Sequence, residues 1–362
     1  MSLSCGIVGL PNAGKSTIFN ALTQSRALVA DYPFTTIEPN VGIVNVPDER
    51  LQRLADIIRP RKIIPATLKF IDIAGLVKGA SKGEGLGNKF LGHIREVDAL
   101  LHVVRCFESD VAHDFESVDP KRDVEVVNLE LTLADLESVE RRKEKVAKIA
   151  KSGNREAQVE YGFLERIEDH LSGGNTARKF MAAGETEGKL LIDLNLLTNK
   201  PVLYVANLEE TIEYEYLTEI LETISEGEHA GVIKIFGKLE LELQELTEEE
   251  MMQYLQEIGF SESGLSRLVK ASYGLLGLVT FYTTNGVELR AWSVKSGTKA
   301  PKAAGKIHSD FEKGFIKAEV ISYEDFIKCG SDSKARELGI LRIEGKDYQI
   351  EDGNMVYFRF KN

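Results

Sequence analysis

The sequence predicts an α/β protein that carries a helical insertion and ends in a smaller β-rich module. Four short apolar runs, at 3–8, 67–72, 100–106 and 201–206, are typical of buried parallel strands. A long polar segment with helical spacing separates the third run from the fourth. Beyond residue 278, short strand-like runs alternate with turn signals, which indicates a separate module.

The first strand leads into a phosphate-binding motif. Residues Gly9 to Ser16 read GLPNAGKS and fit the pattern G-x-x-x-x-G-K-[ST]. A strand, a glycine-rich turn and a helix N-terminus present backbone N–H groups and a helix dipole to an anion. Lys15 is expected to reach the β- and γ-phosphates, and Ser16 to hold Mg²⁺. The expected nucleotide contacts in this segment are Asn12, Ala13, Gly14, Lys15, Ser16 and Thr17.

Three downstream positions complete the predicted phosphate site. Asp72 ends the second strand, so we expect its carboxylate to contact Mg²⁺ through water and the Gly75 N–H to meet the γ-phosphate. Thr36, in a loop with two prolines, is expected to complete the Mg²⁺ shell when a γ-phosphate is present. Leu76 stands where many GTPases have a glutamine that orients water, so slow hydrolysis is expected.

The fourth strand ends in Asn207-Leu208-Glu209-Glu210, where GTPases usually carry N-K-x-D. Glu210 is longer than the aspartate that binds guanine, and Leu208 replaces the lysine, so a strict guanine clamp is broken. We expect Asn207 to pair with the N6/N7 edge of adenine and Leu208 to pack on the ring, which favours ATP over GTP. Gly237, after a last predicted strand, is expected to contact the base. The alternative is that this segment only begins an acidic helix.

The segment between the third and fourth strands predicts an αα-hairpin that turns at Ser152-Gly153-Asn154. Its first half has apolar residues at helical spacing, namely Leu129, Leu133, Leu136, Val139, Val146 and Ile149. Its tip is basic and contains Arg141, Arg142, Lys143, Lys145, Lys148, Lys151 and Arg155. Two interpretations stay open: a solvated face paired with nearby glutamates, or a contact with RNA phosphates or the ribosome.

The C-terminal segment predicts a small ubiquitin-like β-grasp module. Strands at 279–284 and 287–292 flank Asn285-Gly286, a strong hairpin signal. A helix over 303–315, a strand over 316–321, a second hairpin over 340–350 and a last strand over 355–360 follow. A basic stretch is formed by Lys295, Lys299, Lys302 and Lys306. We therefore place the nucleotide-binding domain at 1–127 and 199–277, the helical hairpin at 128–198 and the C-terminal module at 278–362.

The bulk properties exclude several classes of protein. The net charge of −12 argues against nucleic-acid binding by the entire surface. No apolar stretch reaches membrane-spanning length, and the N-terminus lacks a secretory signal. The three cysteines are far apart, so we expect reduced thiols in a cytoplasmic protein. The six histidines lack zinc-ligand spacing.

These motifs together resemble the YchF or Obg-like ATPase family, an Obg-related branch of P-loop GTPase-like proteins. The matching stretches cover essentially the entire chain; they are GLPNAGKST from Gly9, YPFTTIEPN from Tyr32, DIAGL from Asp72, NLEE from Asn207 and AWSVKSGTKAPKAAGKIHSDFEKGFIKAEV from Ala291. The resemblance implies a Ras-like G domain, a helical insertion, a C-terminal TGS domain, hydrolysis of ATP and association with ribosomes, translation and stress responses. It also implies that a hydrophobic residue, here Leu76, replaces the catalytic glutamine.

The same resemblance draws attention to His113, which lies in the loop after the third strand and is a candidate substitute for that glutamine. An ordinary exposed loop histidine is the alternative interpretation. The expected catalytic residues are therefore Lys15, Gly75 and His113, with Ser16, Thr36 and Asp72 at the metal.

The leading prediction is a cytoplasmic, Mg²⁺-dependent ATPase that acts as a switch, with slow intrinsic turnover and ribosome or RNA as partner. One alternative is a GTPase proper, in which Glu210 replaces the aspartate that binds guanine. A second alternative is a ribosome- or RNA-binding adaptor in which the nucleotide only locks a conformation.

Overall fold

The computed structural model describes residues 3–25, 41–73, 86–107, 118–209 and 215–361. The described residues fall into two compact units. The first unit takes its described residues from 3–25, 41–42 and 69–268, and the second takes them from 43–68 and 269–361.

A six-stranded sheet holds the predicted nucleotide-binding motif, with strand order β2-β4-β1-β5-β6-β7. Its strands are β1 (Ser4–Val8), β2 (Val41–Asn45), β4 (Thr67–Asp72), β5 (Ala99–Cys106), β6 (Val202–Leu208) and β7 (Gly231–Ile235). The pairs β1–β4, β1–β5, β5–β6 and β6–β7 are parallel. All residues of β1 and β5 are buried, as expected for parallel strands covered on both faces. The four predicted strands of this sheet are confirmed.

The helices of the first unit include α1 (Lys15–Gln24), α3 (Leu86–Glu96), α4 (Pro120–Ala150), α7 (Glu215–Glu226), α8 (Gly237–Glu242) and α9 (Glu248–Glu257). Helix α10 (Gly264–Leu275) begins in this unit, and its residues from 269 onward belong to the second. One apolar cluster joins the sheet to α3, α4 and α7 through Ile94, Leu131 and Leu221. Chain order reverses at β1, between β4 and β5, so the carboxyl end of β1 is the edge where such sheets bind ligands.

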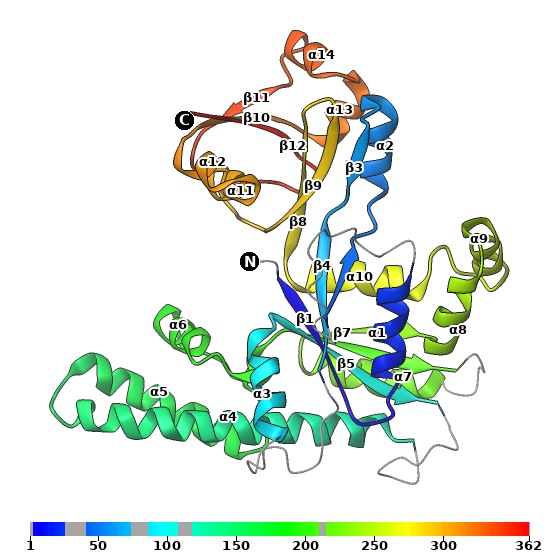
Figure 1. The fold of residues 1–362 in the computed structure, drawn as a ribbon. Helices are drawn as coiled ribbons and strands as arrows, with labels where there is room; N and C mark the ends of the chain where they lie inside the picture. Colours follow the sequence, from blue (N-terminus) through cyan, green and yellow to red (C-terminus); the bar gives the residue numbers. More distant parts are fainter. Residues whose placement is uncertain (1–2, 26–40, 74–85, 108–117, 210–214, 362) are drawn as a thin grey trace. The chain divides into compact units, whose positions relative to one another are not determined.

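The predicted hairpin is confirmed as α4 packed against α5 (Arg155–Ser172), as Figure 1 shows. Asp119 caps α4 and Asn154 caps α5, each by accepting a hydrogen bond from a backbone N–H of the first turn. Helix α6 (Glu185–Asp193) follows, and the chain returns to β6 through the short 3-10 helices Ala177–Lys179 and Leu197–Asn199 on either side of it. Helix α4 therefore begins at Pro120, before the predicted boundary at 128.

The apolar pattern predicted for the first half of the hairpin is only partly used. Val139 and Val146 are buried in the hairpin core with Phe163 and Ile167. Leu129, Leu133 and Ile149 are instead 52%, 41% and 53% exposed. The reason is that α4 contacts two different neighbours: Val127 and Leu131 face the sheet, whereas the later residues face α5. A single apolar stripe along α4 cannot face both the sheet and α5.

The second unit contains a six-stranded sheet with order β11-β10-β12-β8-β9-β3. Its strands are β3 (Lys62–Ile64), β8 (Leu278–Thr284), β9 (Glu288–Lys295), β10 (Phe315–Ile321), β11 (Arg342–Glu344) and β12 (Met355–Phe360). Its helices are α2 (Glu49–Ile58), α11 (Ala300–Ile307), α12 (Ser309–Lys313), α13 (Tyr323–Cys329) and α14 (Asp332–Glu337). The sheet packs on α11 through Phe281, Ala304 and Val320, in agreement with the predicted β-grasp.

Three details of this unit differ from the sequence expectations. The helix expected over 303–315 is two helices, because His308 has an extended backbone and its side chain caps α12. The hairpin expected over 340–350 does not form: β11 pairs with β10, and Gln349 makes only a bridge to Lys299. Residues 43–68, placed in the nucleotide-binding domain, group with the C-terminal unit, because β3 pairs in parallel with β9.

Two general expectations concern the membrane and the cysteines. Among the described residues, no helix is both long and apolar enough to cross a membrane. Cys5, Cys106 and Cys329 are buried and form no disulfide. Burial raises the pKa of the Cys106 thiol to about 12, so this thiol stays protonated at neutral pH.

Candidate nucleotide-binding site

The loop between β1 and α1 has the backbone that a phosphate cradle needs. Gly9 has φ 149° and Gly14 has φ 91°, conformations that favour glycine. A Cβ at Gly9 would lie 2.3 Å from the carbonyl oxygen of Val103 on β5, so the loop passes directly over the neighbouring strand. Helix α1 begins immediately after Gly14 and has no acidic residue in its first turn, which leaves its N-terminus suited to an anion.

Lys15 is held inside this loop. Its side chain is only 7% exposed, and its Nζ donates a 2.7 Å hydrogen bond to the carbonyl oxygen of Leu10. Burial lowers the pKa of Lys15 to about 8, although the negative charge of Asp72 opposes this shift. Among the described residues the Lys15 ammonium has one hydrogen-bond acceptor, so a phosphate would be a favourable further partner for this buried cation.

Ser16 and Asp72 form the predicted metal pair. The Ser16 hydroxyl donates to Asp72 Oδ2 at 3.3 Å, and Asp72 stands at the end of β4. The second carboxylate oxygen, Oδ1, is buried and has no hydrogen-bond partner among the described residues. Burial raises the pKa of Asp72 above its usual value, against the effects of Lys15 and Ser16. A hydroxyl beside an unsatisfied carboxylate oxygen is a donor set that fits Mg²⁺ with its water ligands.

Asn207 links the phosphate loop to the far end of the site. It is 4% exposed, its Nδ2 donates to the carbonyl oxygen of Ala13 at 3.0 Å, and its Oδ1 accepts from the Gly237 N–H at 3.1 Å. Added Cβ atoms would lie 2.0 Å from Asn207 Nδ2 at Gly14 and 2.8 Å from its Oδ1 at Gly237. From the end of β6, Asn207 therefore joins the phosphate loop to the first residue of α8, a role that its sequence position did not indicate.

The remaining predicted residues are placed as follows. Leu208 is half-buried at the end of β6, next to Glu209, which pairs with Lys238 at 3.4 Å. Thr17 is half-buried in α1, and Asn12 is exposed with φ 60°. Five predicted positions lie outside the described residues: Thr36, Gly75, Leu76, His113 and Glu210. The contact of Asn207 with adenine stays a prediction; it would use the second N–H and second lone pair of the amide.

A buried ionic cluster, also unforeseen, fastens the insertion to β6. Glu228 is 5% exposed and accepts hydrogen bonds from the hydroxyl of Tyr204 and from Arg178 Nη1, each at 2.8 Å. Asn128 of α4 donates to its other oxygen at 3.3 Å. The sequence gives no sign that Glu228 and Arg178 are buried, because only the fold brings these charged side chains together.

Comparisons with known proteins match the chain from end to end. A family model described as "50S ribosome-binding GTPase" matches residues 4–152. The YchF-GTPase C-terminal model, described as "Protein of unknown function (DUF933)", matches residues 278–361. A protein of Bacillus subtilis named "Ribosome-binding ATPase YchF" is 51% identical over 99% of this chain and 100% of its own length. The chain belongs to the YchF family.

Further relatives support this assignment. The YchF protein of Haemophilus influenzae is 49% identical over 99% of each chain. A solved structure, titled "Structure of the Schizosaccharomyces pombe YchF GTPase", superposes with a TM-score of 0.89 at 36% identity and covers 99% of this chain and 98% of its own. The YchF resemblance predicted from the motifs is therefore confirmed, and so is the fold class of a P-loop α/β domain with a helical insertion and a β-grasp module.

The basic hairpin tip divides into paired and unpaired residues. Arg142 pairs with Glu160 at 2.6 Å, Arg141 with Glu137 at 3.6 Å, and Lys143 forms a short ion pair with Glu168. Lys148, Lys151 and Arg155 are exposed, and no ion pair involves them within the described part of the chain. The solvated-face interpretation therefore fits the paired residues, and the contact with RNA phosphates or the ribosome stays a prediction for the others.

Proposed function

We propose that this chain is an Mg²⁺-dependent ATPase that acts as a molecular switch and binds the ribosome. The observation that supports the chemistry best is the buried, unpartnered Oδ1 of Asp72 beside the Ser16 hydroxyl, one residue from the buried cation of Lys15. Together these groups supply a metal position and a phosphate position at one loop. The names of the YchF relatives support the same activity.

Phosphoryl transfer needs positioning and charge stabilisation more than covalent chemistry. Lys15 and the backbone N–H groups at the start of α1 would hold the phosphates and stabilise the charge that develops on them. Ser16 would bind Mg²⁺ directly and Asp72 would hold it through water; the ion would neutralise phosphate charge. Thr36 and Gly75 are the proposed sensors of the γ-phosphate. Leu76 has no group that orients water, so slow intrinsic turnover is expected.

ATP is proposed as the substrate because the guanine clamp is altered at two positions. Leu208 and Glu210 stand where lysine and aspartate would complete N-K-x-D. A polar pocket built for a hydrogen-bonding group strongly rejects analogues that lack it, so losing that clamp removes the selection for guanine. Calorimetric titration of the full chain with ATP and with GTP, each with Mg²⁺, tests this.

A matched variant sharpens that titration. The double substitution Leu208→Lys with Glu210→Asp restores N-K-x-D without touching the phosphate loop. We expect the native chain to prefer ATP and the variant to gain GTP affinity by about tenfold or more. If the native chain binds GTP more tightly, Glu210 still reads guanine and the chain works as a GTPase with a variant base clamp.

Ribosome binding is proposed to use the unpaired basic residues at the hairpin tip, with the TGS module as a second contact. Lys148→Glu with Lys151→Glu should reduce co-sedimentation with purified ribosomes, most strongly at low salt. The control Lys121→Glu with Lys189→Glu makes the same charge change at residues away from the tip. Equal binding by both variants would remove the tip from the proposal. Full ribosome binding by Lys15→Ala without hydrolysis would favour the adaptor function.

A further inference from the structure

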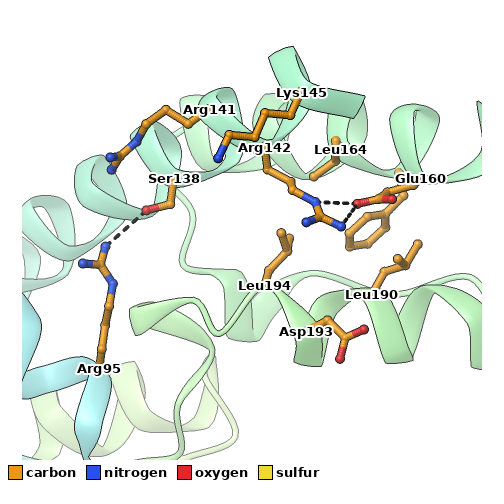
Figure 2. Close-up of a pocket in the computed structure, with 11 residues that line it drawn as sticks. Arg95, Ser138, Arg141, Arg142, Lys145, Glu160, Leu164, Leu190, Asp193 and Leu194 are labelled. Atoms are coloured by element: carbon orange, nitrogen blue, oxygen red, sulfur yellow. Dashed lines mark hydrogen bonds and ion pairs between the residues drawn. The ribbon is translucent and has the colours of Figure 1, made fainter. Parts of the chain in front are cut away.

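A hollow in the helical insertion has the chemistry of a second ligand site. It has a volume of about 650 Å³. The residues that line it, drawn in Figure 2, come from α3, α4, α5, α6 and the residue just after α6. This volume falls within the range of small-molecule sites and suits a mononucleotide. All residues that line it belong to the first unit, and neither the phosphate loop nor the base end of the nucleotide site contributes to it.

The hollow is cationic although the chain as a whole is acidic. Its walls carry Arg95 from α3 and Arg141, Arg142 and Lys145 from α4, against only two carboxylates, Glu160 and Asp193. With a net charge of −12 on the chain, a concave cluster of positive charge stands out. Walls of low dielectric constant focus such a field and concentrate anions in the hollow.

The cations in the hollow are unequally satisfied. Arg142 pairs with Glu160 at 2.6 Å, and Arg141 pairs with Glu137 at 3.6 Å. Arg95 donates a hydrogen bond to the Ser138 hydroxyl at 3.2 Å and forms no ion pair with a described residue. Lys145 forms no ion pair within the described residues, and it lies one helical turn after Arg141. Like charges at this spacing repel each other on a helix, so an anion between them would relieve an unfavourable contact.

The opposite wall carries leucine side chains beside the carboxylate of Asp193. Leu190 of α6 and Leu194 just after it face Arg142 across the hollow, with Leu164 of α5 nearby (Figure 2). A guanidinium group whose orientation is fixed by a carboxylate can stack on one face of a planar ring. The leucine side chains can pack against the other face of that ring. Phosphate-binding cations beside such a slot match a phosphorylated nucleoside better than they match a simple inorganic anion.

We propose that this hollow binds a phosphorylated nucleoside, with its phosphate at Arg141, Lys145 and Arg95 and its base between Arg142 and the two leucines. A free nucleotide and a nucleotide within a single-stranded RNA share this chemistry. The site is independent of the phosphate loop, so its failure would leave the proposed ATPase activity unaffected.

The test counts bound nucleotides on the full-length chain. Equilibrium dialysis with radiolabelled ADP and Mg²⁺ should find two ADP per native chain, and one per chain for Arg141→Glu with Lys145→Glu. The control Lys121→Glu with Lys189→Glu makes the same charge change at exposed lysines that do not line the hollow, and it should keep two. Thermal unfolding of both variants checks that the exposed substitutions leave the fold intact.

If the natural ligand of the hollow is a nucleotide within RNA, the native chain should bind one ADP and should also bind a short oligoadenylate. Binding of that oligonucleotide should then fall about tenfold in the Arg141→Glu, Lys145→Glu variant and much less in the control. The proposal is overturned if the native chain binds one ADP and no oligoadenylate. It is also overturned if the two double variants lose nucleotide equally, since that result would reflect general surface charge.

Discussion

The two ends of the predicted nucleotide site are built differently. At the phosphate end, Lys15 is buried and Asp72 is half-buried, and within the described part of the chain each has part of its hydrogen-bonding capacity unused. At the base end, Asn207 is equally buried, but each of its polar atoms already bonds the backbone. The first arrangement carries an energetic cost that a ligand would relieve, whereas the second is satisfied without one.

We interpret this difference as one between proposed ligand-binding residues and residues that position them. A buried polar group without a partner destabilises the free protein, so its presence at a strand end points to a missing ligand. A buried polar group with backbone partners fixes loop geometry. Substitutions at the phosphate end should therefore affect chemistry, and those at Asn207 and its neighbours should affect the shape of the loop.

The largest effect on ATP hydrolysis is expected from substitution of Lys15. Lys15→Ala should lower the single-turnover rate of ATP hydrolysis by about a hundred- to thousandfold, because one charge-stabilising donor at phosphate is lost. Rapid-quench measurement with saturating nucleotide gives this rate. Lys189→Ala, an exposed lysine of α6, is the control and should hydrolyse ATP at the native rate. An unchanged rate in Lys15→Ala would mean that the phosphate site lies elsewhere.

Next comes Gly14→Ala, compared with Gly153→Ala in the turn of the hairpin. Both glycines have positive φ, 91° and 87°, but a Cβ meets Asn207 Nδ2 at 2.0 Å in the first and open space in the second. Gly153→Ala should lower the free energy of unfolding by about 1 kcal/mol from backbone strain alone. Gly14→Ala should lower it by about 2–4 kcal/mol, since the clash adds to the strain. Urea denaturation measures both, and equal losses would contradict the close packing at Asn207.

A smaller effect is expected for Asn207→Ala. Losing two backbone hydrogen bonds should loosen the phosphate loop and weaken ATP and GTP alike by about tenfold, which corresponds to about 1.4 kcal/mol. Calorimetry with both nucleotides measures the ratio, and Asn20→Ala, on the exposed side of α1, serves as the control. A loss confined to ATP would show that the Asn207 carboxamide reads adenine directly, as the sequence predicts.

The mildest test is pH. In the free chain the pKa of Lys15 is lowered to about 8, so Lys15 loses its proton as the pH rises above 8. Bound phosphate would favour the protonated form, so above this pH ATP binding would require the uptake of a proton. The affinity for ATP should therefore fall by about tenfold between pH 7 and pH 9. In Lys15→Met this slope should disappear. A native affinity that is flat with pH would show that Lys15 stays charged without ligand.

Much of this molecule is determined by local sequence. The loop from Gly9 to Ser16, the parallel strands and the Asn285-Gly286 hairpin follow from turn chemistry and from the spacing of apolar residues, and these are short-range properties. The pairing of Ser16 with Asp72 was also predictable, because parallel strands end at one edge of their sheet.

Other features of the fold were decided by tertiary structure alone. Residues 43–68 join the C-terminal sheet through β3, a strand of three residues that is too short to carry a period. Leu129 and Leu133 have the spacing of a core stripe yet lie exposed, because α4 changes neighbours along its length. The brace at Asn207 joins residues 194 positions apart. Hydrogen bonds and strand pairs of this kind depend on which distant groups the fold brings together, and local propensity does not encode that choice.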